Sequence, residues 1–302
     1  METAGEGVTM LTQQLLNGLV LGTIYCLFSI GFNLIFGVLH VINLVYGVYF
    51  AMGAYVALVL ATTFGLPFIA VVPAVVCVVG LIAALIDWAV LMPLKGREGR
   101  YLASLIITMG AALFLYSLLG HAFGVEARRF PVDFGPSALY RFGGVSITGV
   151  QIAILAIAPL LIGVLAYFLK FSRWGIAIRA AADNERASLI VGINPMLITL
   201  GVSFLAAALS ATAGMLIGLN FNAVQPYMGE FMMLRGFAIV IIGGLGSLPG
   251  AAIAGLALGI MEILTSAYGS SLYREVLTFA LLLLTLWIFP NGLVKQVNAR
   301  RP

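Results

Sequence analysis

Nine apolar segments, joined by short polar stretches, account for most of the chain. A helix of about 20 apolar residues crosses the roughly 30 Å hydrocarbon layer of a bilayer. The pattern therefore predicts an all-α polytopic membrane protein, with residues 1–302 in one transmembrane domain and helices near 13–36, 40–62, 66–92, 102–123, 149–170, 195–220, 232–245, 250–268 and 274–290. The segment 232–245 is short, so it either crosses fully or re-enters, and about eight or nine transmembrane or re-entrant helices are expected.

Composition supports the same class. Hydrophobic residues make up 62% of the chain and charged residues 9%, whereas a soluble domain carries roughly a quarter charged residues. The net charge of +4 requires no nucleic-acid partner, because cytoplasmic loops of membrane proteins are rich in Lys and Arg.

The distribution of these basic residues predicts the orientation. If nine segments cross and the polar segment 171–194 is cytoplasmic, the positive-inside rule is satisfied. The carboxyl terminus then lies inside, and the amino terminus and the 124–148 loop lie outside. The basic residues expected inside are Lys95, Arg97, Arg100, Lys170, Arg173, Arg179, Arg186, Lys295, Arg300 and Arg301, and those on or near the outside are Arg128, Arg129, Arg141, Arg235 and Arg274.

A charged, Ala-rich segment from Arg173 to Asn194 interrupts the apolar runs. Residues 179–189 are expected to form one helix, because the run 180–182 favours a helix and Arg179 and Asp183 are spaced to pair across one turn. A short soluble helix in an internal loop is expected to contact either a partner protein or anionic lipid headgroups. Its apolar side would be formed by Ile178, Ala182, Ala187 and Leu189.

Two stretches rich in Gly and polar residues, 31–53 and 236–250, interrupt the apolar pattern in the two halves of the chain. Broken segments in corresponding halves indicate a substrate path in transporters built from repeats. We therefore hypothesise an inverted repeat with a broken helix in each half. The residues expected along the path are Asn33, Asn43, Gly47, Gly243, Gly244, Gly246 and Glu262.

Glu262 is the most informative ionisable residue, because the pattern places it near or beyond the middle of a membrane helix. An intramembrane carboxylate needs a function or a buried partner, and both roles stay open. Arg235 is the expected partner. Asp87, next to Trp88, is instead expected at the membrane interface with its charge in water.

The sequence contains no His-Glu-x-x-His helix, Gly-x-Ser-x-Gly elbow or Gly-Lys-Ser/Thr phosphate loop. Two His and two Cys residues form no metal-ligand pattern. We therefore expect a protein that is not an enzyme, with no catalytic residue, no metal site and no cofactor bound to this chain. Any hydrolysis of ATP must take place on another polypeptide.

Several sequence blocks occur in a recognisable order. They are Asn17-Gly18-Leu19 with Gly22 and Tyr25, the 31–53 stretch with Asn43 and Gly53, the Arg173–Asn194 segment, Pro226-Tyr227, and the run Gly243-Gly244-Leu245-Gly246-Ser247-Leu248-Pro249-Gly250. Over residues 12–292 the chain resembles the permease subunits of bacterial ABC importers for branched-chain amino acids. Related permeases for urea and short-chain amides share much of this pattern, so these substrates stay open as an alternative.

The resemblance implies a multi-pass protein of the bacterial inner membrane and three kinds of partner. These are ATP-binding cassette subunits that carry ATP, a second permease subunit (a paralogue or a second copy), and an extracytoplasmic solute-binding protein. The 124–148 loop could receive the solute-binding protein.

The resemblance also implies that 171–194 is the cytoplasmic coupling-helix loop that docks on the ATP-binding subunit. The Glu that begins this loop in the family is absent here, and the Ala-to-Gly spacing is longer. The residues expected to couple are Arg179, Ala181, Ala182, Asp183, Asn184, Glu185, Ala187, Leu189 and Gly192.

Two other classes of transport protein fit the sequence less well. An ion-coupled secondary transporter could use Glu262 and the broken stretches, but that function would leave the 171–194 segment without a role. An ion channel is disfavoured because no filter-like repeat or ring of charges is found in the sequence.

Overall fold

The computed structural model describes residues 2–91, 100–136, 138–142, 144–269, 273–289 and 292–294. These described residues form eleven helices and one antiparallel hairpin, β1 with β2. The elements are α1 (Glu2–Leu39), α2 (Tyr46–Thr62), α3 (Phe68–Leu91), α4 (Arg100–Phe123), β1 (Leu139–Phe142), β2 (Val145–Thr148), α5 (Gly149–Phe171), α6 (Arg173–Asp183), α7 (Glu185–Ile190), α8 (Pro195–Phe221), α9 (Met228–Gly243), α10 (Leu248–Tyr268) and α11 (Tyr273–Ile288).

Each of the nine predicted apolar segments forms a helix, namely α1 to α5 and α8 to α11. Among the described residues, α1, α3, α4, α5, α8 and α10 are long and apolar enough to cross a membrane, and α2, α9 and α11 are shorter. The chain is an all-α polytopic membrane protein, as the sequence predicts. The inverted repeat stays a prediction.

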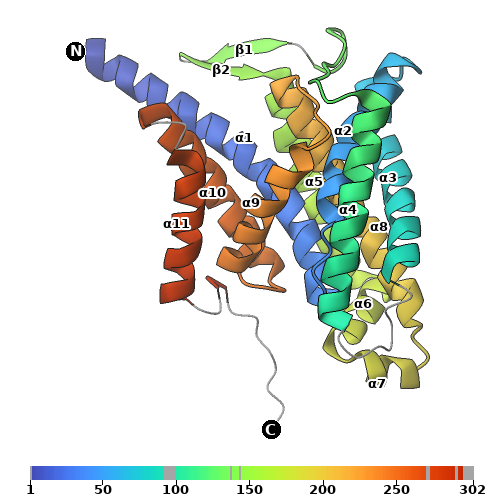
Figure 1. The fold of residues 1–302 in the computed structure, drawn as a ribbon. Helices are drawn as coiled ribbons and strands as arrows, with labels where there is room; N and C mark the ends of the chain where they lie inside the picture. The colour runs from blue at the N-terminus through green and yellow to red at the C-terminus, as the bar shows by residue number, and fades with distance from the viewer. Residues whose placement is uncertain are drawn as a thin grey trace.

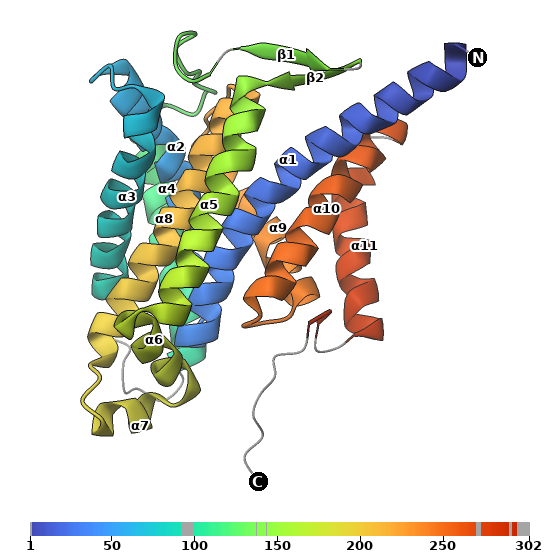
Figure 2. The same cartoon turned by 180° about the vertical axis from the view of Figure 1, so that it is seen from behind.

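The helices form one bundle with two distinct ends (Figures 1 and 2). The β1–β2 hairpin and the amino-terminal part of α1 lie at one end, here called the hairpin end. The helices α6 and α7 and the last turn of α11 lie at the opposite end, here called the α6–α7 end. The helix α1 crosses the bundle diagonally, with α10 and α11 on one side and α2, α3, α4 and α8 on the other.

Basic residues follow this division into two ends. Lys170, at the end of α5, and Arg173 and Arg179, on α6, lie at the α6–α7 end, and Arg128 and Arg141 belong to the loop and hairpin at the other end. Lys95, Arg97, Lys295, Arg300 and Arg301 lie outside the described residues. These five described residues lie at the ends that the sequence predicts, whereas Arg235, expected on or near the outside, lies within the bundle beside Glu262.

The helices α1 and α10 pack along small residues. A Cβ atom on Gly22 would lie 2.9 Å from the Cα atom of Leu256, and one on Gly259 would meet the backbone of Gly22. Glycine allows this approach of the two backbones, as small residues spaced by four commonly do between membrane helices.

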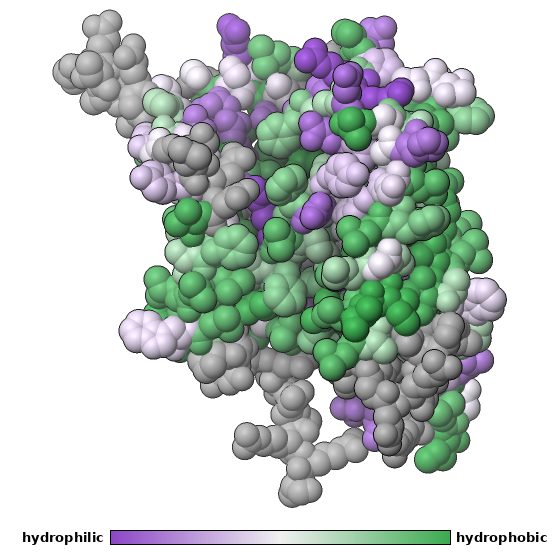
Figure 3. Space-filling model, in the orientation of Figure 1, coloured by the Kyte–Doolittle hydropathy of each residue, from purple (hydrophilic) through white to green (hydrophobic). Residues whose placement is uncertain are grey.

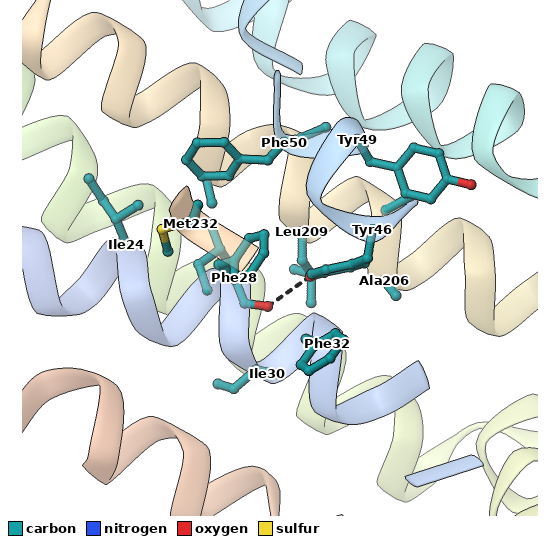
Figure 4. Close-up of a cluster of buried hydrophobic side chains, with 14 of the residues drawn as sticks. Ile24, Phe28, Ile30, Phe32, Tyr46, Tyr49, Phe50, Ala206, Leu209 and Met232 are labelled. Atoms are coloured by element: carbon teal, nitrogen blue, oxygen red, sulfur yellow. Dashed lines mark hydrogen bonds between the residues drawn. The ribbon is translucent and has the colours of Figure 1, made fainter. Parts of the chain in front are cut away.

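The core lies where α1, α2 and α8 meet (Figure 4). The Tyr46 hydroxyl donates a hydrogen bond to the Phe28 carbonyl oxygen at 2.7 Å, and the ring of Phe28 meets that of Phe50 edge to face at 5.5 Å. The Ser210 hydroxyl donates to the Tyr46 carbonyl oxygen at 3.1 Å. These contacts fix the first turn of α2 against two long helices.

The predicted segment 40–62 is helical only from Tyr46 onward. His40 has a φ of 53° and ends α1, and residues 41–45 form an irregular connection. The Asn43 side chain accepts a hydrogen bond from the Val45 N–H at 3.0 Å, and such a local bond competes with helix formation. The polar residues that mark this stretch in the sequence therefore produce a true break between two helices.

The helix α9 connects the two ends of the bundle although it has only 16 residues. Before it, Val224 pairs with Arg128 of the loop at the hairpin end. After it, the chain contacts Asn33, near the last turns of α1 at the opposite end. The predicted segment 232–245 therefore runs through the bundle and does not turn back within it.

Candidate functional site

Glu262 on α10 is fully buried and contacts side chains of two other helices. The Tyr25 hydroxyl on α1 donates a hydrogen bond to its carboxylate at 2.6 Å. The Nη2 atom of Arg235 on α9 lies 3.4 Å from Oε1 of Glu262, and the Arg235 side chain keeps 21% of its surface exposed. The predicted pairing of Glu262 with Arg235 is confirmed, and Tyr25 is a third member that the sequence did not identify.

This cluster lies deep in the apolar part of the bundle. Tyr25 is close to the middle of the apolar span Thr9–Leu39. A charged side chain at the centre of a membrane helix costs about 2.5–3.5 kcal/mol on insertion scales, and an opposite charge with a hydroxyl donor offsets that penalty. The three residues also join α1, α9 and α10 through polar contacts.

Asn33 on α1 holds the turn between α9 and α10. Its Oδ1 accepts a hydrogen bond from the Gly246 N–H at 2.6 Å, and its Nδ2 donates to the Ser247 carbonyl oxygen at 2.8 Å. Gly244 and Gly246 have φ values of 104° and 82°, a region that favours glycine. The stretches 31–53 and 236–250, which the sequence singled out separately, therefore meet at this turn.

Asn43 lies in a second polar cluster with Asp87 of α3. The Oδ1 atom of Asp87 accepts hydrogen bonds from Asn43 Nδ2 at 2.9 Å and from the Tyr49 hydroxyl at 2.8 Å. Asp87 is fully buried, whereas Trp88 is 47% exposed. The expectation that the Asp87 charge lies in water is wrong, because successive helical residues point about 100° apart and an exposed neighbour does not imply an exposed carboxylate.

Gly47, in the first turn of α2, packs against Gly229, in the first turn of α9. A Cβ atom on Gly47 would lie 2.8 Å from the Gly229 carbonyl oxygen and 2.9 Å from the Tyr116 hydroxyl. A Cβ atom on Gly243 would similarly meet the backbone of Gly250. Both glycines therefore serve close backbone packing.

The predicted path residues occupy four places in the bundle. Asn33 contacts the turn that contains Gly244 and Gly246, and Gly243 immediately precedes this turn. Asn43, Gly47 and Glu262 each lie in a separate cluster. Their role in a path stays a prediction.

The segment 171–194 folds as two short helices, α6 and α7, where one helix over 179–189 was expected. Ser172 caps α6 by accepting a hydrogen bond from the Gly175 N–H at 2.8 Å, and Asn184 caps α7 by accepting from the Ala187 N–H at 3.0 Å. Asn184 has extended backbone, so it separates the two helices. Gly192, with a φ of 82°, follows the end of α7, where a positive φ favours glycine.

One side of the α6–α7 unit packs on the bundle and the other side is exposed. Ile178, Ala181 and Ser188 are buried, at 2%, 8% and 2% exposure. The apolar side that the sequence predicts is therefore not a single exposed surface, because Ile178 faces the bundle and Ala182 is half-buried. The exposed large apolar residues are Trp174 and Ile176 on α6 and Leu189, Ile190 and Val191 at the end of α7, and of these only Leu189 was expected to couple.

The nine predicted coupling residues differ in exposure. Ala181 is buried and Ala182 is half-buried, and the side chain of Glu185 lies outside the described part of the structure. The exposed members are Arg179, Asp183, Asn184, Ala187, Leu189 and Gly192. Beside them, α6 and the start of α8 form a shallow groove of about 230 Å³, lined by Arg173, Trp174, Ala177, Ile193, Asn194, Leu197 and Ile198.

The predicted external loop 124–148 is attached to the bundle at two points. The Gln13 side chain exchanges hydrogen bonds with the backbone of Ser146, at 2.9 and 2.8 Å. The backbones of Arg128 and Val224 exchange two further hydrogen bonds, at 2.9 and 2.8 Å. Part of this loop forms β1 and β2, which the sequence did not predict.

Comparisons with known proteins identify relatives along nearly the whole chain. Residues 14–286 match the family described as the branched-chain amino acid transport system / permease component. The permease LivH of the high-affinity branched-chain amino acid transport system of Escherichia coli K12 is 31% identical, covering 96% of this chain and 97% of LivH. BraD of Pseudomonas aeruginosa, a permease named in the same terms, is 30% identical over 96% of this chain and 97% of its own length.

Two more distant similarities extend this comparison. LivM of Escherichia coli K12, another permease protein of that system, is 26% identical over 91% of this chain and 68% of LivM. The solved structure of PsaBC from Streptococcus pneumoniae in complex with Fab shares the fold, with a TM-score of 0.51, 13% identity and coverage of 93% of this chain and 92% of that one. The chain is a multi-pass membrane protein that belongs to the family of permease components of branched-chain amino acid transport systems.

Proposed function

We propose that this chain is the membrane-spanning permease subunit of an ATP-driven importer in the bacterial inner membrane. The importer carries branched-chain or related hydrophobic amino acids. ATP binds and is hydrolysed on a separate ATP-binding cassette subunit, and this chain binds no cofactor. The names of the relatives support the substrate class, because LivH and BraD are described as permeases for branched-chain amino acids.

The exposed surface of α7 is the observation that carries the ATP-driven part of the proposal. Leu189, Ile190 and Val191 are 55%, 88% and 73% exposed, next to the exposed Asp183 and Asn184. A compact apolar group rimmed by polar residues at one end of a membrane protein is typical of a protein-binding surface. The occupant that we propose is the ATP-binding subunit.

The attachment of α6 supports transmission of a movement from that surface to the membrane helices. Only Ser172 separates α5 from α6, and a Cβ atom on Gly175 would meet the backbone of Leu169. Ile178 is buried against the bundle. We therefore expect a force on α7 to pass through α6 to α5 and to displace it as a rigid body.

Two further partners complete the proposed importer. A second permease subunit, either a paralogue or a second copy, forms the path together with this chain. The similarity to LivM supports a paralogue, since LivH and LivM are both named as permeases of one system. A solute-binding protein docks at the hairpin end, on the 124–148 loop, whose attachment through Gln13 and Val224 gives it a fixed position.

Co-purification and uptake test this function. Ile190→Asp places a charge in the α7 surface, so it is expected to reduce co-purification of the ATP-binding subunit and uptake of leucine by roughly tenfold or more, the effect expected of one apolar anchor lost from an interface. Ile190→Val keeps the apolar surface and is the matched control. Normal association and uptake by Ile190→Asp contradict the coupling role of α7.

The same uptake assay separates the alternative functions. Preferential uptake of urea or short-chain amides over leucine identifies the related permease class. Uptake that stops on dissipation of the proton gradient, while ATP is kept constant, identifies an ion-coupled secondary transporter. In that case Glu262, the buried carboxylate paired with Arg235, becomes the candidate ion-coupling residue.

A further inference from the structure

One face of α9 exposes charged residues although the helix runs through the apolar bundle. Glu230, Phe231 and Leu234 are exposed, and Arg235 keeps 21% of its side-chain surface exposed. Figure 3 shows hydrophilic side chains interrupting the apolar surface in the region of α9, below the hairpin end.

The depth of Arg235 makes this exposure informative. Its partner Glu262 also binds Tyr25, which is close to the middle of the apolar span of α1. A partly exposed guanidinium at that depth would be strongly disfavoured next to lipid hydrocarbon, where polar groups have no partners. The surface in front of Arg235 is therefore expected to contain water or a polar ligand.

The exposed face of α5, in the same bundle, has a different composition. Between Ile152 and Val164, the exposed residues of α5 are all apolar or glycine. Leu160, in the middle of α5, is 64% exposed, which is close to the 54% of Leu234 on α9. Leu234 and Leu160 are therefore matched apolar positions. Leu234 lies beside charged residues, and Leu160 does not.

The arrangement around Arg235 fits a carboxylate ligand. A guanidinium has five N–H donors, and the contact with Glu262 involves the Nη2 atom. Glu262 is fully buried behind it and fixes the position of the group. The exposed side chains of Phe231 and Leu234, on the same helix, provide an apolar surface for an aliphatic side chain.

We propose that this face of α9 lines the translocation path and that Arg235 binds the carboxylate of the passing aliphatic amino acid. Glu262 is a positioning residue that holds the Arg235 guanidinium. The proposal rests on the transport function proposed above and adds the surface and the residue that contact the substrate.

The reactivity of an introduced thiol tests whether water reaches this face of α9. Leu234→Cys and the control Leu160→Cys are placed in a Cys77→Ala background, because Cys77 is exposed and Cys26 is buried. Membranes containing the intact transporter are treated with a charged, membrane-impermeant methanethiosulfonate, which reacts with thiolates in water. We expect Leu234→Cys to react at least tenfold faster than Leu160→Cys. Equal, slow rates would mean that lipid or a dry subunit contact covers α9, and they would overturn the proposal.

Paired charge removal tests the role of Arg235. Arg235→Gln leaves Glu262 without its cation and can misfold for that reason. The single variant therefore does not distinguish a role in stability from a role in substrate binding. The double variant Arg235→Gln/Glu262→Gln removes both charges and is expected to keep the thermal stability of the wild type. Its leucine uptake is expected to fall by roughly tenfold or more, the loss typical of one charge-assisted hydrogen bond. Full uptake by this stable double variant would show that Arg235 only neutralises Glu262.

The two experiments separate this inference from the function on which it rests. If the wild type takes up no leucine with its partners and ATP, the proposed function fails, whatever the thiol rates are. If the wild type transports leucine and Leu234→Cys reacts as slowly as Leu160→Cys, only the assignment of α9 fails.

Discussion

The side chain of Asn33, near the end of α1, accepts a hydrogen bond of 2.6 Å from the backbone N–H of Gly246, in the turn between α9 and α10. The residues are 213 positions apart in the chain. Asn33 also donates to the Ser247 carbonyl oxygen, so a single side chain satisfies two backbone groups of this turn.

Asn33→Ala is therefore expected to lower the free energy of unfolding by about 1–3 kcal/mol, because it removes the hydrogen bonds from Asn33 to two backbone groups of the turn. Thermal unfolding in detergent measures the change. Ser29→Ala is the control, since the Ser29 hydroxyl reaches the Ala251 carbonyl oxygen only at 3.5 Å. Equal stability of the two variants would contradict the role of Asn33.

Replacing Gly244 or Gly246 with Val is expected to impair transport while the protein still inserts. Both glycines have positive φ values, and a β-branched residue there costs about 1–3 kcal/mol in backbone strain. Gly110→Val on α4 is the control, because no atom lies within 4 Å of the Cβ position. Uptake in cells and the amount of protein in the membrane are measured together. Full uptake by both turn variants would rule out a need for this geometry.

The topology is tested with single cysteines in a Cys77→Ala background. Val132→Cys, at a position 91% exposed in the 124–148 loop, should react with an impermeant reagent added to intact cells. Ile190→Cys, at a position 88% exposed on α7, should react only after permeabilisation. Ser188 is only 2% exposed and is not suitable as a probe. The reverse labelling pattern would overturn both the orientation and the assignment of α7 to the cytoplasm.

Charge reversal at Asp183 and Glu185 separates a protein partner from a lipid surface. If α6 and α7 dock on an ATP-binding subunit, Asp183→Lys/Glu185→Lys is expected to reduce association with that subunit and to abolish substrate-stimulated ATP hydrolysis. If they lie on anionic lipid, each added Lys strengthens membrane binding by about 1 kcal/mol. ATP hydrolysis and subunit co-purification in vesicles distinguish these outcomes. Unchanged coupling removes the role proposed for the two acids.

Asp87→Ala is expected to lower the free energy of unfolding by about 2–3 kcal/mol, because Asn43 and Tyr49 lose a shared, buried acceptor. Asp133→Asn, in the exposed loop at the hairpin end, is the control and should change little. Thermal unfolding of the two variants is compared with that of the wild type. A stable Asp87→Ala variant would show that the Asn43 and Tyr49 side chains find other partners.

Hydrophobic pattern was sufficient to predict the helices, because the length and apolarity of a membrane segment are local properties. The pairing of Glu262 with Arg235 was also predictable, since few charges lie at that depth and a buried carboxylate needs a cation. Tyr25 was not predictable as the third member, because Tyr is common in membrane helices and nothing local distinguishes one that meets a distant carboxylate.

The predictions that were wrong also have specific physical causes. The Asp87 carboxylate was expected in water because Trp88 suggested a membrane boundary, but the packing of α3 on α2 and α8 decides which way that carboxylate points. Asn184 broke the expected helix in two, because its side chain caps the next helix and its own backbone is extended. The apolar run Leu189 to Val191 was visible in the sequence, but its exposure depends on the fold.

The backbone pairing of Arg128 with Val224 has a mechanical consequence for α9. One end of this helix follows Val224, which pairs with the 124–148 loop, and the other end leads into the turn bound by Asn33. A helix cannot change its length without breaking its own hydrogen bonds. We therefore expect α9 to move as a rigid unit, so that a displacement of the loop at the hairpin end reaches the α9–α10 turn at the other end of the bundle.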